Sequence, residues 1–376
     1  MGRAVAFRAL AIAYGLVLAV AALEVAFWLL AVEPPKLRTK RLLTDQAAPR
    51  VAYHCYDSNP SREFRKLPDT ATGRWRLRSY MLPPRDLPLF RLRETPWCVE
   101  YRKTPEMLRD REYEGPPAPG VLRIAMVGDS FAYGEGVPIE RTLFRQLEER
   151  LGKGFEVLNL ARPALDTRGE LAMLRKLAGR FHLRRAIVVF VPNDVELSAT
   201  LARRQAYIND LINIRDEYLT SRERRAWYTG HLRVLRFVGS ELEMRRIERA
   251  TVEWYLDAYD ARHNAKNLAA LAGYFRALAA LGDCRVVLVL YPLMHGLESD
   301  YPLSAIHARV AAMGREAGLP VLDLATAFAR QATRSLQVHP TDHHPNGTAH
   351  RIAAETIADW LRRDVPEFLQ VETSAR

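Results

Sequence analysis

The sequence predicts an α/β protein, a three-layer sandwich around a five-stranded parallel sheet, with an N-terminal transmembrane helix and a helical insertion. First, short continuous apolar runs alternate with helix-periodic segments from Val121 onwards, which is typical of a parallel sheet covered on both faces. Second, a long apolar run lies near the N-terminus. Third, the interval between Val191 and Arg285 is far longer than one crossover helix needs.

The N-terminal run from Ala9 to Ala31 is apolar except for Glu24 and is followed by Glu33-Pro34-Pro35. A run of ~20 apolar residues can cross a bilayer as a helix. Because no clear Ala-x-Ala cleavage signature stands at its end, an uncleaved anchor is favoured over a secretory signal peptide. We therefore expect residues 1–35 to form an N-terminal tail and membrane anchor.

Basic residues flank the apolar run on both sides, namely Arg3 and Arg8 before it and Lys36, Arg38, Lys40 and Arg41 after it. Taken literally, the positive-inside rule places the body of the protein in the cytoplasm. A short tail followed by one apolar run is, however, a common layout of an exported signal-anchor protein. We expect a periplasmic or other extracytoplasmic domain, with a cytoplasmic orientation as the alternative.

The segment 36–120 is rich in Pro and Arg and has few periodic apolar runs, so we expect an irregular lead segment packed on the main domain. The breaker cluster 114–120 marks the start of that domain. Cys55 and Cys98 lie in the lead segment and could pair in an exported protein, the alternative being two unpaired thiols. Cys284 precedes an apolar strand and is expected in the core. With no C-x-x-C, no zinc or redox site is expected.

The main domain is expected to comprise residues 121–200 and 263–376. Its five predicted strands are Val121–Val127, Phe155–Leu160, Ala186–Val191, Arg285–Tyr291 and Pro320–Leu324. Its predicted helices are Thr142–Leu151, Gly169–Phe181, Asn264–Leu281 and Ala349–Leu361. Ligands of such folds bind beyond the carboxyl ends of the strands, which locates the site before any motif is considered.

Residues 201–262 are charged, aromatic and helix-periodic, and we expect a helical insertion over the rim of the site. The whole chain carries 55 Lys and Arg against 44 Asp and Glu, a net charge of +11. Such a charge can favour an anionic partner, although a solvated basic surface is the simpler interpretation. Since no zinc-finger, RRM or basic-zipper pattern is present, no nucleic-acid partner is expected.

Three polar motifs follow predicted strands. Gly128-Asp129-Ser130 follows the first strand, Asn193-Asp194 follows the third, and Asp342-His343-His344-Pro345-Asn346 follows the fifth. Each alone has a structural explanation, such as a helix cap or a turn. Because the carboxyl ends of parallel strands meet at one edge of the sheet, all three are expected to converge there.

These motifs resemble the blocks of the SGNH/GDSL hydrolase superfamily, and the chain looks like a membrane-anchored bacterial-type member with the flavodoxin-like SGNH fold. The resemblance implies that Ser130 is the nucleophile, His344 its base and Asp342 the group that orients His344. It also implies an oxyanion hole made by the Ser130 N–H, the Asn193 amide and an N–H from the second block, Asn159 to Ala164. No Gly-x-Ser-x-Gly elbow surrounds Ser130, which argues against the α/β-hydrolase family.

Two departures from the family pattern concern the predicted site. Ala164 stands where the family usually has glycine, so the N–H donor is kept if the turn does not require a positive φ. The Asp342–His344 spacing is Asp-x-His, whereas many members have Asp-x-x-His, and His343 is the competing base. Asp129 is expected to support the turn. The other histidines, His54 among them, are expected to be surface or packing residues.

We therefore expect a serine esterase or acyl hydrolase without a cofactor or metal. Its expected substrate is an ester, with O-acyl groups of a cell-envelope glycan favoured. The alternatives are an O-acyltransferase acting on a polysaccharide, and a non-catalytic domain that binds a glycan or a partner in an envelope assembly. The sequence assigns no oligomeric state.

Overall fold

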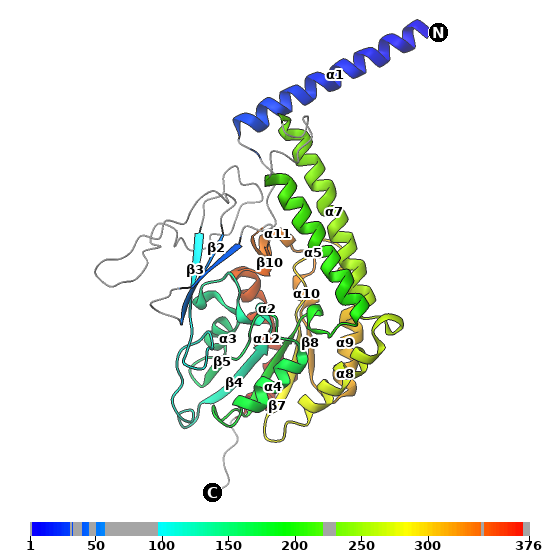
Figure 1. Cartoon of the computed structure of the whole chain (residues 1–376). Coiled ribbons are helices and arrows are strands. Elements are labelled where there is room, and N and C mark those ends of the chain that lie inside the picture. The colour runs from blue at the N-terminus through cyan, green and yellow to red at the C-terminus, as the bar shows by residue number, and fades with distance from the viewer. Residues whose placement is uncertain are drawn as a thin grey trace, which may run out of the picture.

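The computed structural model of this chain describes residues 2–30, 32, 40–44, 50–56, 97–220, 231–339 and 342–370. Its centre is a parallel five-stranded sheet with the order β5-β4-β6-β7-β8 (Figure 1). The strands are β4 Leu122–Gly128, β5 Phe155–Asn159, β6 Arg185–Phe190, β7 Arg285–Leu290 and β8 Val321–Asp323. The predicted fold class and all five predicted strands are confirmed.

The two faces of the sheet bury alternate residues of each strand. On β4, Ile124 and Met126 pack into one core while Ala125 and Val127 pack into the other. This alternation follows from the period of two in a strand, and two apolar faces explain why residues 124–127 of β4 are a continuous apolar run.

Helices cover both faces. The core that contains Ile124 is closed by α3 Leu143–Leu151 and α12 Gly347–Asp364. The opposite core is closed by α4 Thr167–Leu177, α8 Ala261–Ala279 and α9 Ser304–Glu316. The short elements are α2 Ser130–Tyr133, η1 Ile139–Arg141, η2 Pro192–Asp194, α10 Ala325–Phe328, α11 Thr333–Leu336, β9 Gln337–His339, β10 Asp342–Pro345 and η3 Pro366–Leu369.

The insertion contains two long helices, α5 Ala199–Thr220 and α7 Arg233–Ala258, which lie against each other. Figure 1 shows this pair leaving the main domain, and the far end of α7 reaching α1. Near the domain, the Trp254 Nε1–H donates to the Leu201 carbonyl at 3.0 Å, and Arg204 pairs with Asp257. These contacts hold α5 and α7 together at the base of the pair.

The lead segment is not irregular throughout. Within it, β1 Lys40–Thr44, β2 Val51–Tyr56 and β3 Trp97–Arg102 form an antiparallel sheet. The runs of β2 and β3 are aromatic and β-branched, as strands favour. They are far apart in sequence, so neither stretch indicated its partner.

This sheet contains Cys55 and Cys98, the two cysteines that could pair. The β2–β3 register sets the backbone of Cys55 opposite that of Cys98. Cys98 is disulfide-bonded, whereas the side chain of Cys55 lies outside the described residues. Cys284 is a free, buried thiol in the core, as expected.

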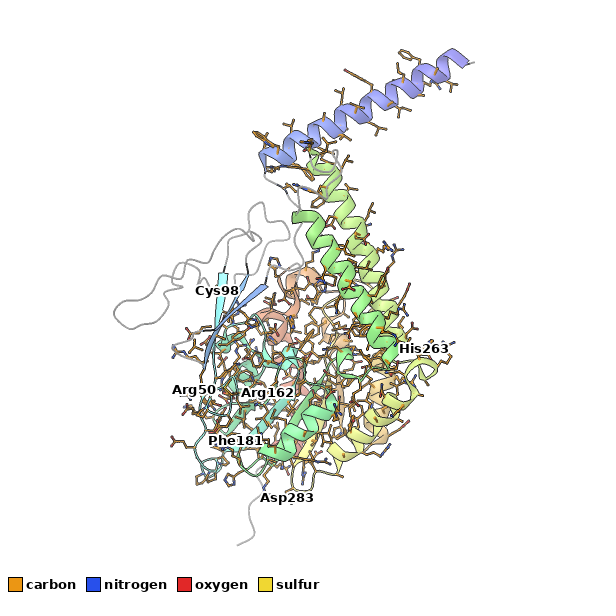
Figure 2. All side chains as sticks on the ribbon, in the orientation of Figure 1. Arg50, Cys98, Arg162, Phe181, His263 and Asp283 are labelled. Carbon is orange, nitrogen blue, oxygen red and sulfur yellow. The ribbon has the colours of Figure 1, made fainter. Side chains whose placement is uncertain are left out.

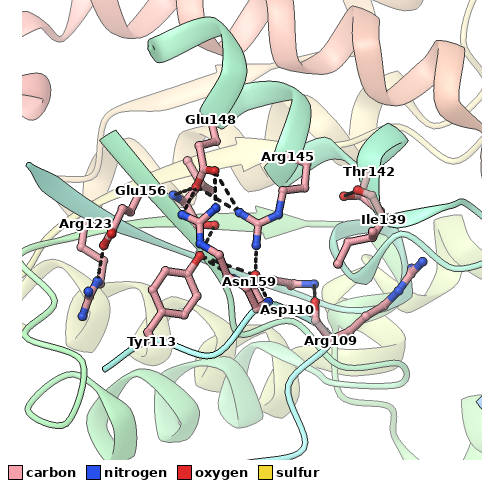
Figure 3. A network of polar contacts seen from close by, with 12 residues as sticks. Arg109, Asp110, Tyr113, Arg123, Ile139, Thr142, Arg145, Glu148, Glu156 and Asn159 are labelled. Atoms are coloured by element: carbon pink, nitrogen blue, oxygen red, sulfur yellow. Dashed lines mark hydrogen bonds and ion pairs between the residues drawn. The ribbon is translucent and has the colours of Figure 1, made fainter. Parts of the chain in front are cut away.

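A polar network attaches the lead segment to the main domain (Figure 3). Asp110 accepts the Asn159 backbone N–H at 2.7 Å and pairs with Arg145 of α3. Glu148 accepts from Arg145 at 3.0 Å and from the Val157 backbone N–H at 2.7 Å. The segment is thereby held on the edge strand β5, next to the second motif block.

The N-terminal helix α1 spans Gly2–Leu29, and its stretch Val5–Leu29 has a mean hydropathy of 2.3 and is unburied. It is long and apolar enough to cross a membrane. Figure 2 shows most of its side chains projecting away from the rest of the protein. Near its end, the Glu24 carboxylate accepts the backbone N–H groups of Arg233 and Val234 at 2.7 and 2.9 Å.

Candidate active site

The turn after β4 presents Ser130 at the carboxyl edge of the sheet. Gly128 ends the strand in a tight place, where an added Cβ would lie 2.7 Å from Ala132 and 2.9 Å from the Val189 carbonyl oxygen. Asp129 then caps α2 by accepting the Phe131 N–H at 2.8 Å. The chain therefore needs glycine for space and a short acid for the cap, and Ser130 begins the helix.

The histidine of the last motif faces this serine. His344 Nε2 lies 2.8 Å from Ser130 Oγ, and His344 Nδ1 contacts an oxygen of Asp342. His343, the competing assignment, instead stacks on His295 with ring centroids 6.4 Å apart. Successive residues of β10 point to opposite sides, so only one of the two histidines can face Ser130.

Asn193 lies beside the same turn. Its Nδ2 donates to Asp129 Oδ2 at 2.8 Å, which leaves the second amide hydrogen available for another acceptor. Asp194 holds the η2 turn by accepting the Val191 N–H at 2.6 Å. Asp129 thus supports both the α2 cap and the orientation of the Asn193 amide, in keeping with its predicted structural role.

Ala164 takes the left-handed conformation, with φ of 62°. An alanine there costs about 1–2 kcal/mol relative to the right-handed region. The turn therefore does use a positive φ, and alanine adopts it nonetheless. Ala164 is exposed, and among the described residues no hydrogen bond occupies its N–H.

Two further carboxyl groups lie buried near Asp129. Burial raises the pKa of Glu170 and of Asp194 well above the usual range, and the charge of Asp129 raises both pKa values further. Burial also raises the pKa of Asp129, against the hydrogen bonds from Asn193 and Phe131. Burial and the repulsion among these carboxyl groups therefore disfavour the charged forms of Glu170 and Asp194.

Glu135 was not predicted from the sequence, and His54 was expected to be a surface or packing residue. Glu135 is buried, and its Oε2 lies 3.8 Å from His344 Nε2. Its Oε1 lies 3.8 Å from Nδ1 of His54, a residue of β2 whose ring packs on Tyr101 at 4.4 Å. The sequence did hold a signal for Glu135, which is an acidic residue between Gly134 and Gly136, shortly after Ser130.

A groove with a volume of about 710 Å³ lies near this edge of the domain. One wall is α7, with Leu242, Arg245 and Val252, and the other includes His295 and Pro302 of the loop after β7. His295 connects the groove to β10 through its stack on His343. Within the described parts of the chain, no group of three or more His, Cys, Asp or Glu could hold a metal ion.

Solved structures with similar folds include esterases. The aryl esterase of M. smegmatis is 15% identical over 64% of this chain and 99% of its own, with a TM-score of 0.35. The carbohydrate acetylesterase Est24 of Sinorhizobium meliloti is 12% identical over 64% and 98%, with a TM-score of 0.34. The lipase/acylhydrolase of Enterococcus faecalis is 16% identical over 64% and 96%, with a TM-score of 0.35.

A comparison with curated proteins finds no match. The sequence profile of the GDSL-like lipase/acylhydrolase family, in contrast, matches residues 126–352, more than half of the chain. The matched range begins in β4, just before Ser130, and ends in α12, after His344. The chain therefore belongs to the GDSL-like lipase/acylhydrolase family.

Proposed function

We propose that this protein is a serine esterase in which Ser130, His344 and Asp342 act as a catalytic triad. The observation that carries the proposal is the contact chain from Ser130 Oγ through the His344 ring to Asp342. A serine hydroxyl becomes an effective nucleophile when an adjacent base takes its proton. His344 Nε2 is within hydrogen-bond distance for that transfer.

The proposed reaction forms and breaks an acyl-serine. Ser130 Oγ bonds to the ester carbonyl carbon while its proton passes to His344 Nε2, and Asp342 stabilises the imidazolium. The oxyanion accepts hydrogen bonds from the N–H groups of Ser130 and Ala164 and from the Asn193 amide. His344 returns the proton to the leaving alcohol, and an acceptor then releases the acyl group.

The proposed substrate is an O-acylated glycan of the cell envelope, reached by an exported domain that α1 anchors in the membrane. The length and hydropathy of α1 support the anchor. The disulfide-bonded Cys98 supports export, since disulfides persist mainly in oxidising compartments.

A second candidate function is acyl transfer to a polysaccharide hydroxyl. The groove between α7 and the loop after β7 favours it, because it offers space for an acceptor close to β10. The non-catalytic alternative has less support, because a binding domain does not need a histidine poised on a serine hydroxyl.

Labelling by a fluorophosphonate probe tests the proposed nucleophile. Wild-type protein should be labelled and should hydrolyse p-nitrophenyl esters, whereas Ser130→Ala should lose labelling and at least about 10³-fold in kcat. Ser335→Ala, which changes an exposed serine on α11, is the matched control. Esterase activity retained in purified Ser130→Ala protein would overturn the proposal. A panel from acetyl to longer acyl esters reports the preferred chain length.

A further inference from the structure

We propose that Glu135 binds the water that releases the acyl group, and so commits the acyl-enzyme to hydrolysis rather than transfer. The proposal rests on the proposed function, since it concerns the second half of the same reaction. Its basis is that one buried carboxylate faces two histidines, His344 of the main domain and His54 of the lead sheet.

The separation of Glu135 and His344 suits one bridging oxygen atom. Glu135 Oε2 and His344 Nε2 are 3.8 Å apart, which is too long for a direct hydrogen bond. An oxygen atom about 2.8 Å from each of them fits that separation. In the acyl-enzyme, Ser130 Oγ no longer has a proton to give, so His344 Nε2 is free to accept one from an incoming nucleophile.

The number of hydrogens on the incoming nucleophile decides whether water or an alcohol suits these two groups. Neutral His344 Nε2 accepts a hydrogen bond, and so does Glu135 in its carboxylate form. Water has two hydrogens and satisfies both of them at once. An alcohol or a sugar hydroxyl has one hydrogen, so binding it at Nε2 leaves its oxygen lone pairs facing the carboxylate. His344 Nε2 and Glu135 together therefore favour water over an alcohol as the nucleophile.

Hydrolysis of the acyl-enzyme forms one bond to the acyl carbon and breaks another. The water oxygen bonds to the acyl carbonyl carbon, one water proton passes to His344 Nε2, and the other stays on the oxygen as a donor to Glu135. The bond between the carbon and Ser130 Oγ then breaks, and the proton on Nε2 passes to Ser130 Oγ. A carboxylic acid leaves, and the free serine is restored.

The loop that carries Glu135 is held in place by the lead segment. The buried Arg109 guanidinium donates to the carbonyl oxygens of Tyr133, at 3.0 Å, and of Val137, and it lies 3.9 Å from the centre of the Tyr101 ring. Gly134 has φ of 76°, and an added Cβ there would meet the Thr142 side chain at 2.5 Å. The loop is thus fixed by contacts on both sides, and Glu135 is held in position before water binds.

His54 lies beside the far oxygen of this carboxylate. Its ring packs on Tyr101, and its Nδ1 faces Glu135 Oε1 at 3.8 Å. Under the proposal, the lead sheet is part of the active site, because it places an imidazole beside Glu135.

Burst kinetics separate the two halves of the reaction. With p-nitrophenyl acetate and the full-length protein in detergent, Glu135→Gln should keep the burst of p-nitrophenol and fluorophosphonate labelling within about twofold of wild type. Its steady-state hydrolysis should fall about tenfold or more. With added methanol, its ratio of methyl acetate to acetate should rise at least about tenfold, because a glutamine amide can donate to the alcohol oxygen.

Glu140→Gln, at an exposed acid in the same segment, should leave both halves unchanged. His54→Gln should also keep the burst and lose steady-state hydrolysis, to a smaller extent than Glu135→Gln. It replaces Glu135→Gln as the test if that variant does not fold. An equal loss of burst and turnover would overturn the proposal, as would an unchanged product ratio. Absence of both fluorophosphonate labelling and ester hydrolysis in wild type would instead contradict the proposed function itself.

Discussion

At the scale of single residues, the imidazole of His344 lies close to three oxygen-bearing side chains. Ser130 and Asp342 were expected from the motifs, while Glu135 was found from the structure. The choice between His343 and His344 depended on which side of β10 faces the serine. Adjacent side chains on a strand point in opposite directions. The contact with Ser130 therefore distinguishes His344 from His343, which the sequence left as alternatives.

His350, one turn into α12 beneath the site, gives a prediction about acid stability. Burial, and then the positive charges of Arg109, His344 and Arg141, lower its pKa to about 3. The unfolded chain binds this proton below about pH 6.5 and the folded chain does not. Stability should therefore fall as the pH drops from about 6.5 towards 3, by up to about 1.4 kcal/mol per pH unit for this one group.

Urea unfolding at pH 7 and pH 5 measures the contribution of His350. His350→Leu should show a smaller loss of unfolding free energy between the two pH values than wild type. His263→Gln, at a half-exposed histidine, should retain the wild-type difference. An equal difference in wild type and His350→Leu would mean that this residue does not carry the effect.

At the scale of elements, the N-terminal helix α1 packs against α7 of the insertion. α7 begins at Arg233 after Leu232, whose side chain cannot cap a helix. Glu24 of α1 supplies the missing acceptor from another element, and the rings of Phe27 and Phe237 pack edge to face at 5.6 Å. The one acidic residue of the apolar run therefore has a defined partner.

Removing this cap should loosen the start of α7. Glu24→Ala should cost about 1 kcal/mol, because two backbone N–H groups lose their acceptor. Hydrogen exchange should become faster over residues 233–238 and stay unchanged over the last turns of the helix. Glu248→Ala, in the middle of α7, is the control. Unchanged exchange at residues 233–238 would show that the contact with Glu24 contributes nothing.

At the scale of the whole molecule, the anchor and the disulfide-bonded cysteine belong to one prediction, that the domain faces out of the cytoplasm. Proteinase K should digest the domain in right-side-out membrane vesicles and spare it in inside-out vesicles. The physical reason is that a protease cannot cross the bilayer. Digestion only in inside-out vesicles would support the cytoplasmic orientation that the flanking charges suggest.

Much of the fold could be predicted because its signals are local. The apolar runs of β4 to β8 and the helix-periodic segments between them each show in a short window of sequence. The sheet β1–β3 was missed because a long stretch of chain separates β2 from β3. Glu135 and His54 were missed for the same reason, since their contact joins two segments that no motif connects.

The sequence by itself determined the fold class, the family resemblance and the edge of the sheet where the motifs meet. It could do so because the carboxyl ends of parallel strands lie together whatever fills the loops. Only the tertiary structure decided that His344 faces Ser130, that Ala164 takes a positive φ, and that a carboxylate from the next loop faces the same imidazole. These depend on side-chain direction and on long-range packing, which spacing along a chain does not encode.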